Sequence, residues 1–266
     1  MEMSIEPIKE PGYGPFTPDA EFVKFLYLSV DDHKACETAE QIKSWWCPGS
    51  GRSWSKRPTI AVFLCAEDEI AEHSDFHDLL LNKEEIRHTF EAMGFMCKIY
   101  RDGSKDSLNK VLSCKADIRW IFAHGVEHGG ISCREGFVDW TDVQEWMQPT
   151  GLLNMSPCYS ANAMCEDEID WLPLRDALAE KASAMILTRG LGHHFPWRYK
   201  ENAKHFVIQN FAYIVQQCRA VGFRQAIEQF EEAIGRNLPN LASHITDHEI
   251  AFGHEDWGLV DRGAVV

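Results

Sequence analysis

The sequence predicts a three-layer α/β fold, with a mostly parallel central sheet flanked by helices and a small helical appendage at the N-terminus. Two observations carry this prediction: apolar runs of strand length, and amphipathic segments of helix length that alternate with them. Strands of a parallel sheet are covered on both faces, so their sequences are apolar throughout. A chain of 266 residues can bury a substantial core around such a sheet.

The first 56 residues are predicted to form an N-terminal arm and helical appendage, and residues 57–266 the main domain. Residues 19–46 carry two helical patterns, and in the second of them apolar side chains between positions 35 and 46 fall near one helix face. The stretch 47–58 is basic and rich in turn-forming residues, which is typical of a linker. The boundary between the two parts is therefore expected there.

Strands and helices are expected to alternate in the main domain. Each predicted strand is a short apolar run, and each predicted helix repeats its apolar residues with a period near 3.6. The predicted strands are 59–66, 96–102, 117–125, 151–158 and 183–190. The predicted helices are 84–95, 107–116, 141–147 with Thr141 as its cap, 172–182, and two longer ones around 207–218 and 223–234. Residues 129–140 have the pattern of a hairpin with a polar turn.

Composition excludes several classes of protein. A formal charge of -15 argues against direct binding of nucleic acid, which requires an excess of Lys and Arg. No apolar run reaches 18 residues, so no membrane span is expected. The N-terminus lacks the pattern of a secretory signal, and nine cysteines without framework spacing suit a reducing compartment. The sequence thus predicts a cytoplasmic protein.

Two reactive residues fall at the carboxyl ends of successive predicted strands, where open α/β sheets bind their ligands. His124 ends the third strand and Cys158 ends the fourth. If those strands are neighbours, the imidazole and the thiol approach each other. A free thiol has a pKa of about 8.5, and an adjacent histidine raises its thiolate fraction and transfers its proton. The N–H groups of Gly125 and Cys158 are candidates for holding an oxyanion.

This arrangement resembles the caspase-fold cysteine peptidases (clan CD), which include caspases, metacaspases, legumains, clostripain-like enzymes and bacterial CHAT domains. The resemblance lies in an apolar strand ending in His-Gly and a later apolar strand ending in Cys-Tyr-Ser, and it covers roughly residues 57–261. It implies a cysteine endopeptidase with His124 as general base and acid, Cys158 as nucleophile, and no cofactor. One departure is Ser156-Pro157 before the cysteine, where many relatives have Ala preceded by an acidic residue or Gln.

The resemblance also bears on partners. It implies a protein or peptide substrate and a bacterial signalling or defence role, with activation by a partner, a ligand or cleavage. Arg189, at the end of the fifth strand, is a candidate for binding an acidic substrate side chain, and Asp167, after the nucleophile, for binding a basic one. The competing interpretations are a solvated acidic loop for Asp167, which the composition of that loop favours, and an ordinary surface charge for Arg189.

Two other interpretations compete with the peptidase. A zinc site is conceivable from His124, His128 and Cys133, with His193 and His194 nearby, but histidines four apart usually bind zinc from a helix. Three glycines in the same stretch disfavour a helix there. The second alternative is a non-catalytic interaction or signalling module that binds its partner through N-terminal helices or a Trp-rich surface. The intact pair of His124 and Cys158 favours the enzyme.

Overall fold

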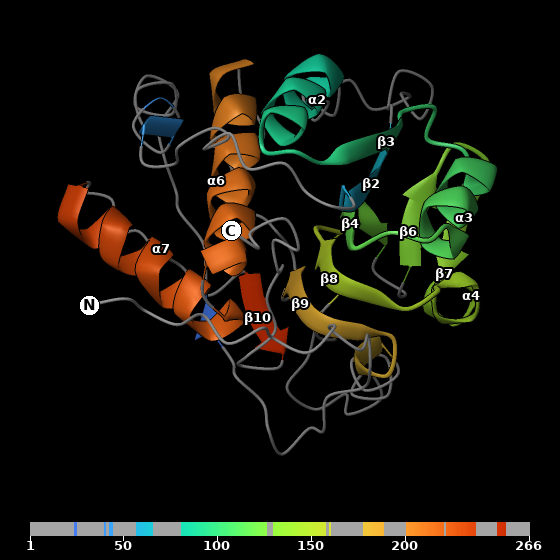
Figure 1. Cartoon of the computed structure of the whole chain (residues 1–266). Coiled ribbons are helices and arrows are strands. Elements are labelled where there is room, and N and C mark those ends of the chain that lie inside the picture. Colours follow the sequence, from blue (N-terminus) through green and yellow to red (C-terminus); the bar gives the residue numbers. More distant parts are fainter. Residues whose placement is uncertain are drawn as a thin grey trace.

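The computed structural model describes residues 24–25, 40, 43–44, 57–65, 81–126, 130–157, 160, 178–188, 201–220, 222–237 and 249–253. Within these ranges the chain forms a seven-stranded sheet with helices on both faces and a small three-stranded sheet beside it (Figure 1). The predicted mixed α/β architecture is confirmed at this level.

The large sheet has the strand order β1-β10-β9-β8-β4-β2-β3. Its five strands from β9 to β3 run parallel, and β10 and β1 are antiparallel additions at one edge. The strands are β1 (Lys24–Phe25), β2 (Thr59–Leu64), β3 (Met96–Tyr100), β4 (Ile118–Phe122), β8 (Thr150–Met155), β9 (Ala182–Thr188) and β10 (Glu249–Gly253). All five predicted strands of the main domain are therefore present.

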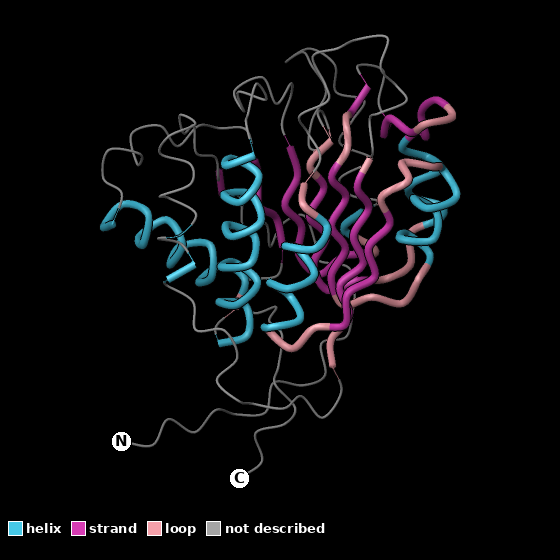
Figure 2. Tube along the Cα trace, turned by 90° about the horizontal axis from the view of Figure 1, so that it is seen from above, coloured by secondary structure: helices cyan, strands magenta, loops and turns pink. Residues whose placement is uncertain are grey.

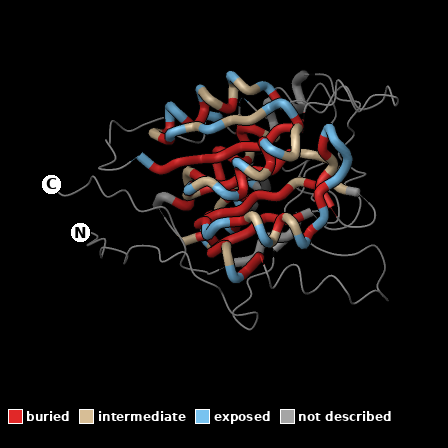
Figure 3. The backbone as a smooth tube through the Cα atoms, turned by 90° about the vertical axis from the view of Figure 1, so that its right-hand side faces the viewer, coloured by how far each residue is buried: buried red, intermediate tan, exposed pale blue. Residues whose placement is uncertain are grey.

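Helices cover the two faces of this sheet (Figure 2). The first core lies on the face of α2 (Lys83–Ala92), α6 (Glu201–Ala220) and α7 (Phe223–Asn237). The second lies on the face of α3 (Lys105–Ser113) and α4 (Trp140–Trp146). Figure 3 shows the buried strands between helices whose outer surfaces are exposed.

The central strand β4 divides its side chains between the two cores, as strand geometry requires. Ile118, Trp120 and Phe122 belong to the first core and Ile121 to the second. The Trp120 ring lies 4.8 Å from the ring of Phe211 on α6, measured between centroids. Both faces of β4 are thus buried, which explains why all its residues except Arg119 are apolar.

Local sequence sets where helix α2 begins and ends. The Asn82 side chain accepts hydrogen bonds from two amides of the first turn. At the other end Gly94 has a φ of 90°, and the amides of Gly94 and Phe95 donate back to the carbonyls of Glu91 and Phe90. This is the Schellman arrangement, which favours glycine at its left-handed position. The predicted helix end near Gly94 is confirmed.

Some predictions are corrected. Lys24–Phe25, inside a predicted helical region, form strand β1 and pair with β10, because an open sheet edge offers hydrogen-bonding partners that local propensity does not anticipate. The cap of α4 is Asp139, whose carboxylate accepts from the Asp142 amide at 2.9 Å, and not Thr141, which lies inside the helix. Strand β10 was not predicted.

Other expectations are met in part. Glu40, Lys43 and Ser44 are helical, in agreement with the second N-terminal pattern. Of the predicted helix 172–182, only its last residues are described, and Leu178 and Ala179 are helical. The division of the chain at residue 56 stays a prediction. None of the helices in the described ranges combines the length and the apolar character needed to cross a bilayer.

The small sheet follows directly after β4. Its strands β5 (Gly125–Val126), β6 (Gly130–Cys133) and β7 (Gly136–Asp139) are antiparallel neighbours in that order. The predicted hairpin at 129–140 is confirmed as β6 and β7, joined by the tight turn at Arg134 and Glu135. Gly136 follows this turn with a φ of 108°, a conformation that side chains disfavour.

Candidate active site

The candidate site lies at the carboxyl edge of the parallel strands. From β2 the chain passes to β3 on one side and then to β4 on the other, so the strand order reverses between β2 and β4. Such a switch point is where open α/β sheets bind ligands. Past the strand ends, the Cys65 amide donates to the Phe122 carbonyl at 3.1 Å and the Ser156 amide to the Ile121 carbonyl at 2.9 Å.

His124 stands at this edge, two residues beyond the end of β4. Its carbonyl accepts a hydrogen bond from the Ser132 amide of β6 at 2.8 Å. The residue is partly exposed, while its Nε2 atom is shielded from solvent. The small sheet therefore holds the backbone of His124, and the imidazole lies at the boundary between the core and the surface.

Gly125 begins strand β5 and lies opposite Ile131 of β6. Antiparallel pairs alternate between residues that exchange hydrogen bonds and residues that do not. Since the neighbouring pair of His124 and Ser132 is hydrogen-bonded, Gly125 occupies the alternate position, where the N–H points away from the partner strand. Strand β5 is an outer strand of the small sheet, so this N–H faces the outer edge of that sheet.

The strands that precede the two predicted catalytic residues are adjacent, as expected from the sequence. Strands β4 and β8 pair in parallel, and each β8 residue lies 34 positions after its β4 partner, from Ile118 and Leu152 to Ile121 and Met155. The same 34 positions separate His124 from Cys158. In the sequence, His124 therefore follows Ile121 by the same number of positions as Cys158 follows Met155, and Ile121 and Met155 are the last paired residues of the two strands.

Three of the predicted site residues, Cys158, Asp167 and Arg189, lie outside the described residues. The chain on either side of Cys158 is described. Pro157 is buried, and the Ser160 amide donates to its carbonyl at 3.2 Å. The Ser160 hydroxyl donates to the Met155 carbonyl at 2.9 Å. Ser160 is therefore joined by hydrogen bonds to Pro157 and to the end of β8.

The alternative zinc site depends largely on residues that are not described, namely His128, His193 and His194. Among the described residues, no group of three metal-ligating side chains is found. Cys133 is buried on β6, where desolvation, with smaller contributions from Cys65 and Glu135, raises the pKa of its thiol to about 12. Cys133 is therefore a thiol rather than a thiolate at neutral pH.

A second thiol lies at the carboxyl edge. Cys65, directly after β2, is only 5% exposed and belongs to the second core. The structure also reveals two polar residues that the sequence did not single out. Glu135 connects the hairpin to α3, and Asp102 binds Ser104 and Ser107 at the start of that helix. For Glu135 the signal in the sequence was the polar turn between β6 and β7, but the partner of that turn could not be deduced.

A scan against protein-family models and a search of curated proteins both found no match to this chain. The interpretation of the site therefore depends on its geometry and on the motif that surrounds His124 and Cys158.

Proposed function

We propose that this protein is a cysteine endopeptidase of the caspase-like type, in which Cys158 is the nucleophile and His124 the general base and acid. The observation that carries the proposal is the register of β4 and β8, whose constant offset equals the separation of the two residues. Neighbouring parallel strands lie about 4.8 Å apart. Two side chains at matching positions past their ends are within reach of one shared pocket.

The reaction follows from the chemistry of the pair. His124 takes the thiol proton while the Cys158 sulfur attacks the carbonyl carbon of the scissile peptide bond. The tetrahedral intermediate collapses by breaking the C–N bond, and His124 gives its proton to the leaving amine. Water, activated by His124, then attacks the thioester; the new carboxylate product leaves and the thiol is restored.

The intermediate carries a negative oxygen, which needs hydrogen-bond donors in fixed positions. We assign this role to the N–H of Gly125, together with that of Cys158. The position of Gly125 opposite Ile131 supports the assignment, because its N–H is not used in pairing with β6. The hydrogen bond from Ser132 to His124 keeps the neighbouring backbone in place.

The substrate is proposed to be a protein or peptide, and an activating partner or ligand is part of the proposal. Arg189 immediately follows Thr188, the last residue of β9, and β9 is the neighbour of β8. A cation there is suited to an acidic substrate side chain. Asp167 is the candidate for a basic one, so the two residues predict opposite preferences.

The test uses short peptides that carry a thiol-reactive electrophile, with labelled residues identified by mass spectrometry. Wild-type protein is expected to be labelled at Cys158, Cys158→Ala not at all, and His124→Ala at least about 100-fold more slowly, because general-base catalysis contributes 10²- to 10⁴-fold. Cys65→Ala is the matched control, since it removes the other thiol at this edge, and it should retain labelling. An acidic preference that Arg189→Glu reverses would assign Arg189 to substrate binding.

Equal labelling of wild-type and His124→Ala protein would refute the peptidase. In that case the non-catalytic interaction module, which needs no activated thiol, becomes the better interpretation.

A further inference from the structure

The hairpin of β6 and β7 is attached at two places, and one of them is the backbone of the proposed catalytic histidine. On the side of the hairpin that faces β5, the Ser132 amide of β6 donates to the His124 carbonyl at 2.8 Å. Its tip, three residues further along the chain, contacts the N-terminus of α3. The hairpin thus connects the backbone of His124 with the N-terminus of α3.

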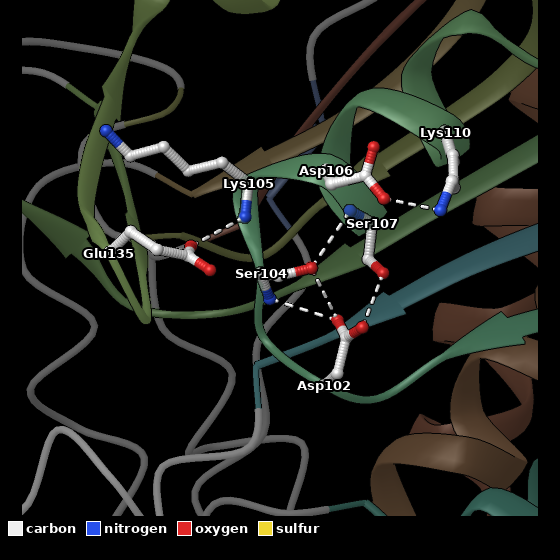
Figure 4. Close-up of polar contacts among 7 residues, drawn as sticks. All are labelled: Asp102, Ser104, Lys105, Asp106, Ser107, Lys110 and Glu135. Carbon is white, nitrogen blue, oxygen red and sulfur yellow. Dashed lines mark hydrogen bonds and ion pairs between the residues drawn. The ribbon is translucent and has the colours of Figure 1, made fainter.

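The contact at the tip consists of two hydrogen bonds, and Figure 4 shows the one between Glu135 and Lys105. The Glu135 carboxylate accepts from the Lys105 amide at 2.9 Å, and the Arg134 amide donates to the Gly103 carbonyl at 2.9 Å. Lys105 is the first residue of α3, and amides of the first helical turn have no partner within the helix. The positive end of the helix dipole also favours a carboxylate there. We call this pair of bonds the tip latch.

The α3 side of the tip latch is itself fixed. The Asp102 carboxylate accepts from the Ser104 amide at 3.0 Å, the Ser104 hydroxyl at 2.9 Å and the Ser107 hydroxyl at 2.9 Å. The Ser104 hydroxyl in turn accepts from the Ser107 amide as the helix cap. Glu135 therefore binds a well-defined helix end rather than a loose loop.

The position of the hairpin tip is linked to that of Ser132 because one face of the hairpin is part of the core. Ile131, Cys133 and Val138 are each at most 2% exposed and belong to the second core. Gly130 is packed so closely that an added Cβ would lie 2.5 Å from the Val138 carbonyl oxygen. A closely packed element moves as a unit, so the position of its tip and the position of Ser132 are linked.

We propose that Glu135 is a positioning residue for His124: the tip latch holds the hairpin in the place from which Ser132 fixes the histidine backbone. The catalytic consequence rests on the proposed peptidase function, whereas the mechanical link does not. Glu135 touches neither substrate nor reacting atoms in this scheme.

The test measures native-state hydrogen exchange of individual amides by NMR. Glu135→Ala is expected to speed exchange of the Ser132 amide about threefold or more, the effect of losing one charge-assisted bond at a helix N-terminus. Glu135→Gln keeps an acceptor oxygen and should stay within about twofold of wild type. Asp106→Ala is the matched control, because Asp106 lies in the same helical turn but pairs only with Lys110 among the contacts described.

Unchanged Ser132 exchange in Glu135→Ala would overturn the inference, and so would an equal rise in Asp106→Ala. A rise shared by the Phe95 amide, which closes α2 far from the hairpin in sequence, would also overturn it, because a positioning effect is local. For peptide cleavage, kcat should fall in Glu135→Ala with KM nearly unchanged, and Glu135→Gln should restore it. If Ser132 exchange responds while no variant cleaves peptide, the link stands and the peptidase proposal fails.

Discussion

Two polar residues of the central β4 region, Arg119 and His124, differ in burial and in the part of the residue that forms the described hydrogen bonds. Arg119 points into the second core face and is fully buried. Its guanidinium donates to the carbonyls of Val111 at 3.0 Å, Pro149 at 3.2 Å and Cys114. His124 is partly exposed, and the hydrogen bond that holds it to the small sheet comes to its main chain.

The difference indicates how each residue is used. Two of the carbonyls that Arg119 binds belong to the last turn and cap of α3, where helix carbonyls have no partner and the dipole favours a cation. The Arg119 side chain is therefore committed to structure. At His124 the hydrogen bond that fixes the residue to the small sheet is accepted by the main-chain carbonyl. Arg119 thus has a structural role, whereas a chemical role is proposed for His124.

The largest expected effect concerns the structural role of Arg119. Arg119→Met should lower the free energy of unfolding by about 3 kcal/mol or more, because buried carbonyls lose their donor. Urea denaturation measures the change. Arg87→Met is the control, since Arg87 forms an exposed ion pair with Glu84 and should cost under about 1 kcal/mol. Equal losses in the two variants would contradict a structural role for Arg119.

A middle-sized effect is expected in the small sheet that holds His124. Gly130→Ala should cost about 1–3 kcal/mol, because the new methyl group meets the β7 backbone, which has to shift. The Ser132 amide should lose protection from exchange in the same variant. A stability within about 0.5 kcal/mol of wild type, with Ser132 still protected, would show that the hairpin adjusts without moving the histidine.

The smallest effect concerns pH at the α3 end of the tip latch. Desolvation acts to raise the pKa of the Asp102 carboxyl. Hydrogen bonds from the Ser104 amide and from the Ser107 and Ser104 hydroxyls outweigh it and hold this pKa below its ordinary value. Its stabilising contribution is therefore complete above the unfolded-state pKa of about 3.9 and is lost as the pH falls through the lower folded value.

On acidification from about pH 5 to about pH 3, the free energy of unfolding should fall less in Asp102→Asn than in wild type, because the variant has no carboxylate to protonate. The difference between the two falls should be under about 1 kcal/mol, since the site is a surface helix terminus. Urea denaturation at several pH values measures the slope. Identical pH dependence in the two proteins would mean that Asp102 contributes nothing as an anion.

Much of the fold was accessible from the sequence because local signals were strong. The run that follows Thr59 in β2 is apolar as far as Leu64, and the strand is fully buried, while Asn82 and Gly94 mark the ends of α2. Strands β1 and β10 were missed because their pairing joins segments more than 200 residues apart, a contact that no local pattern encodes. The cap of α4 was misassigned by two residues, since aspartate and threonine both serve that role.

The candidate site was predictable only in its residue types. His124 and Cys158 attract attention because they follow apolar runs in the sequence, whereas the register of β4 and β8, on which the proposed pairing depends, comes from the fold. The contact of Glu135 with Lys105 spans 30 residues and arises from the fold alone. An arginine in an apolar strand is rare, but the sequence does not indicate what it does there. The role of Arg119 depends on carbonyl partners that come from other elements.

The most direct test of the central claim, that β4 and β8 deliver an imidazole and a thiol to one pocket, is the pH dependence of Cys158 alkylation by iodoacetamide. Wild-type protein should show an apparent thiol pKa below the ordinary value of about 8.5, and His124→Ala should return it to that value. Superimposable pH profiles for the two proteins would contradict the account.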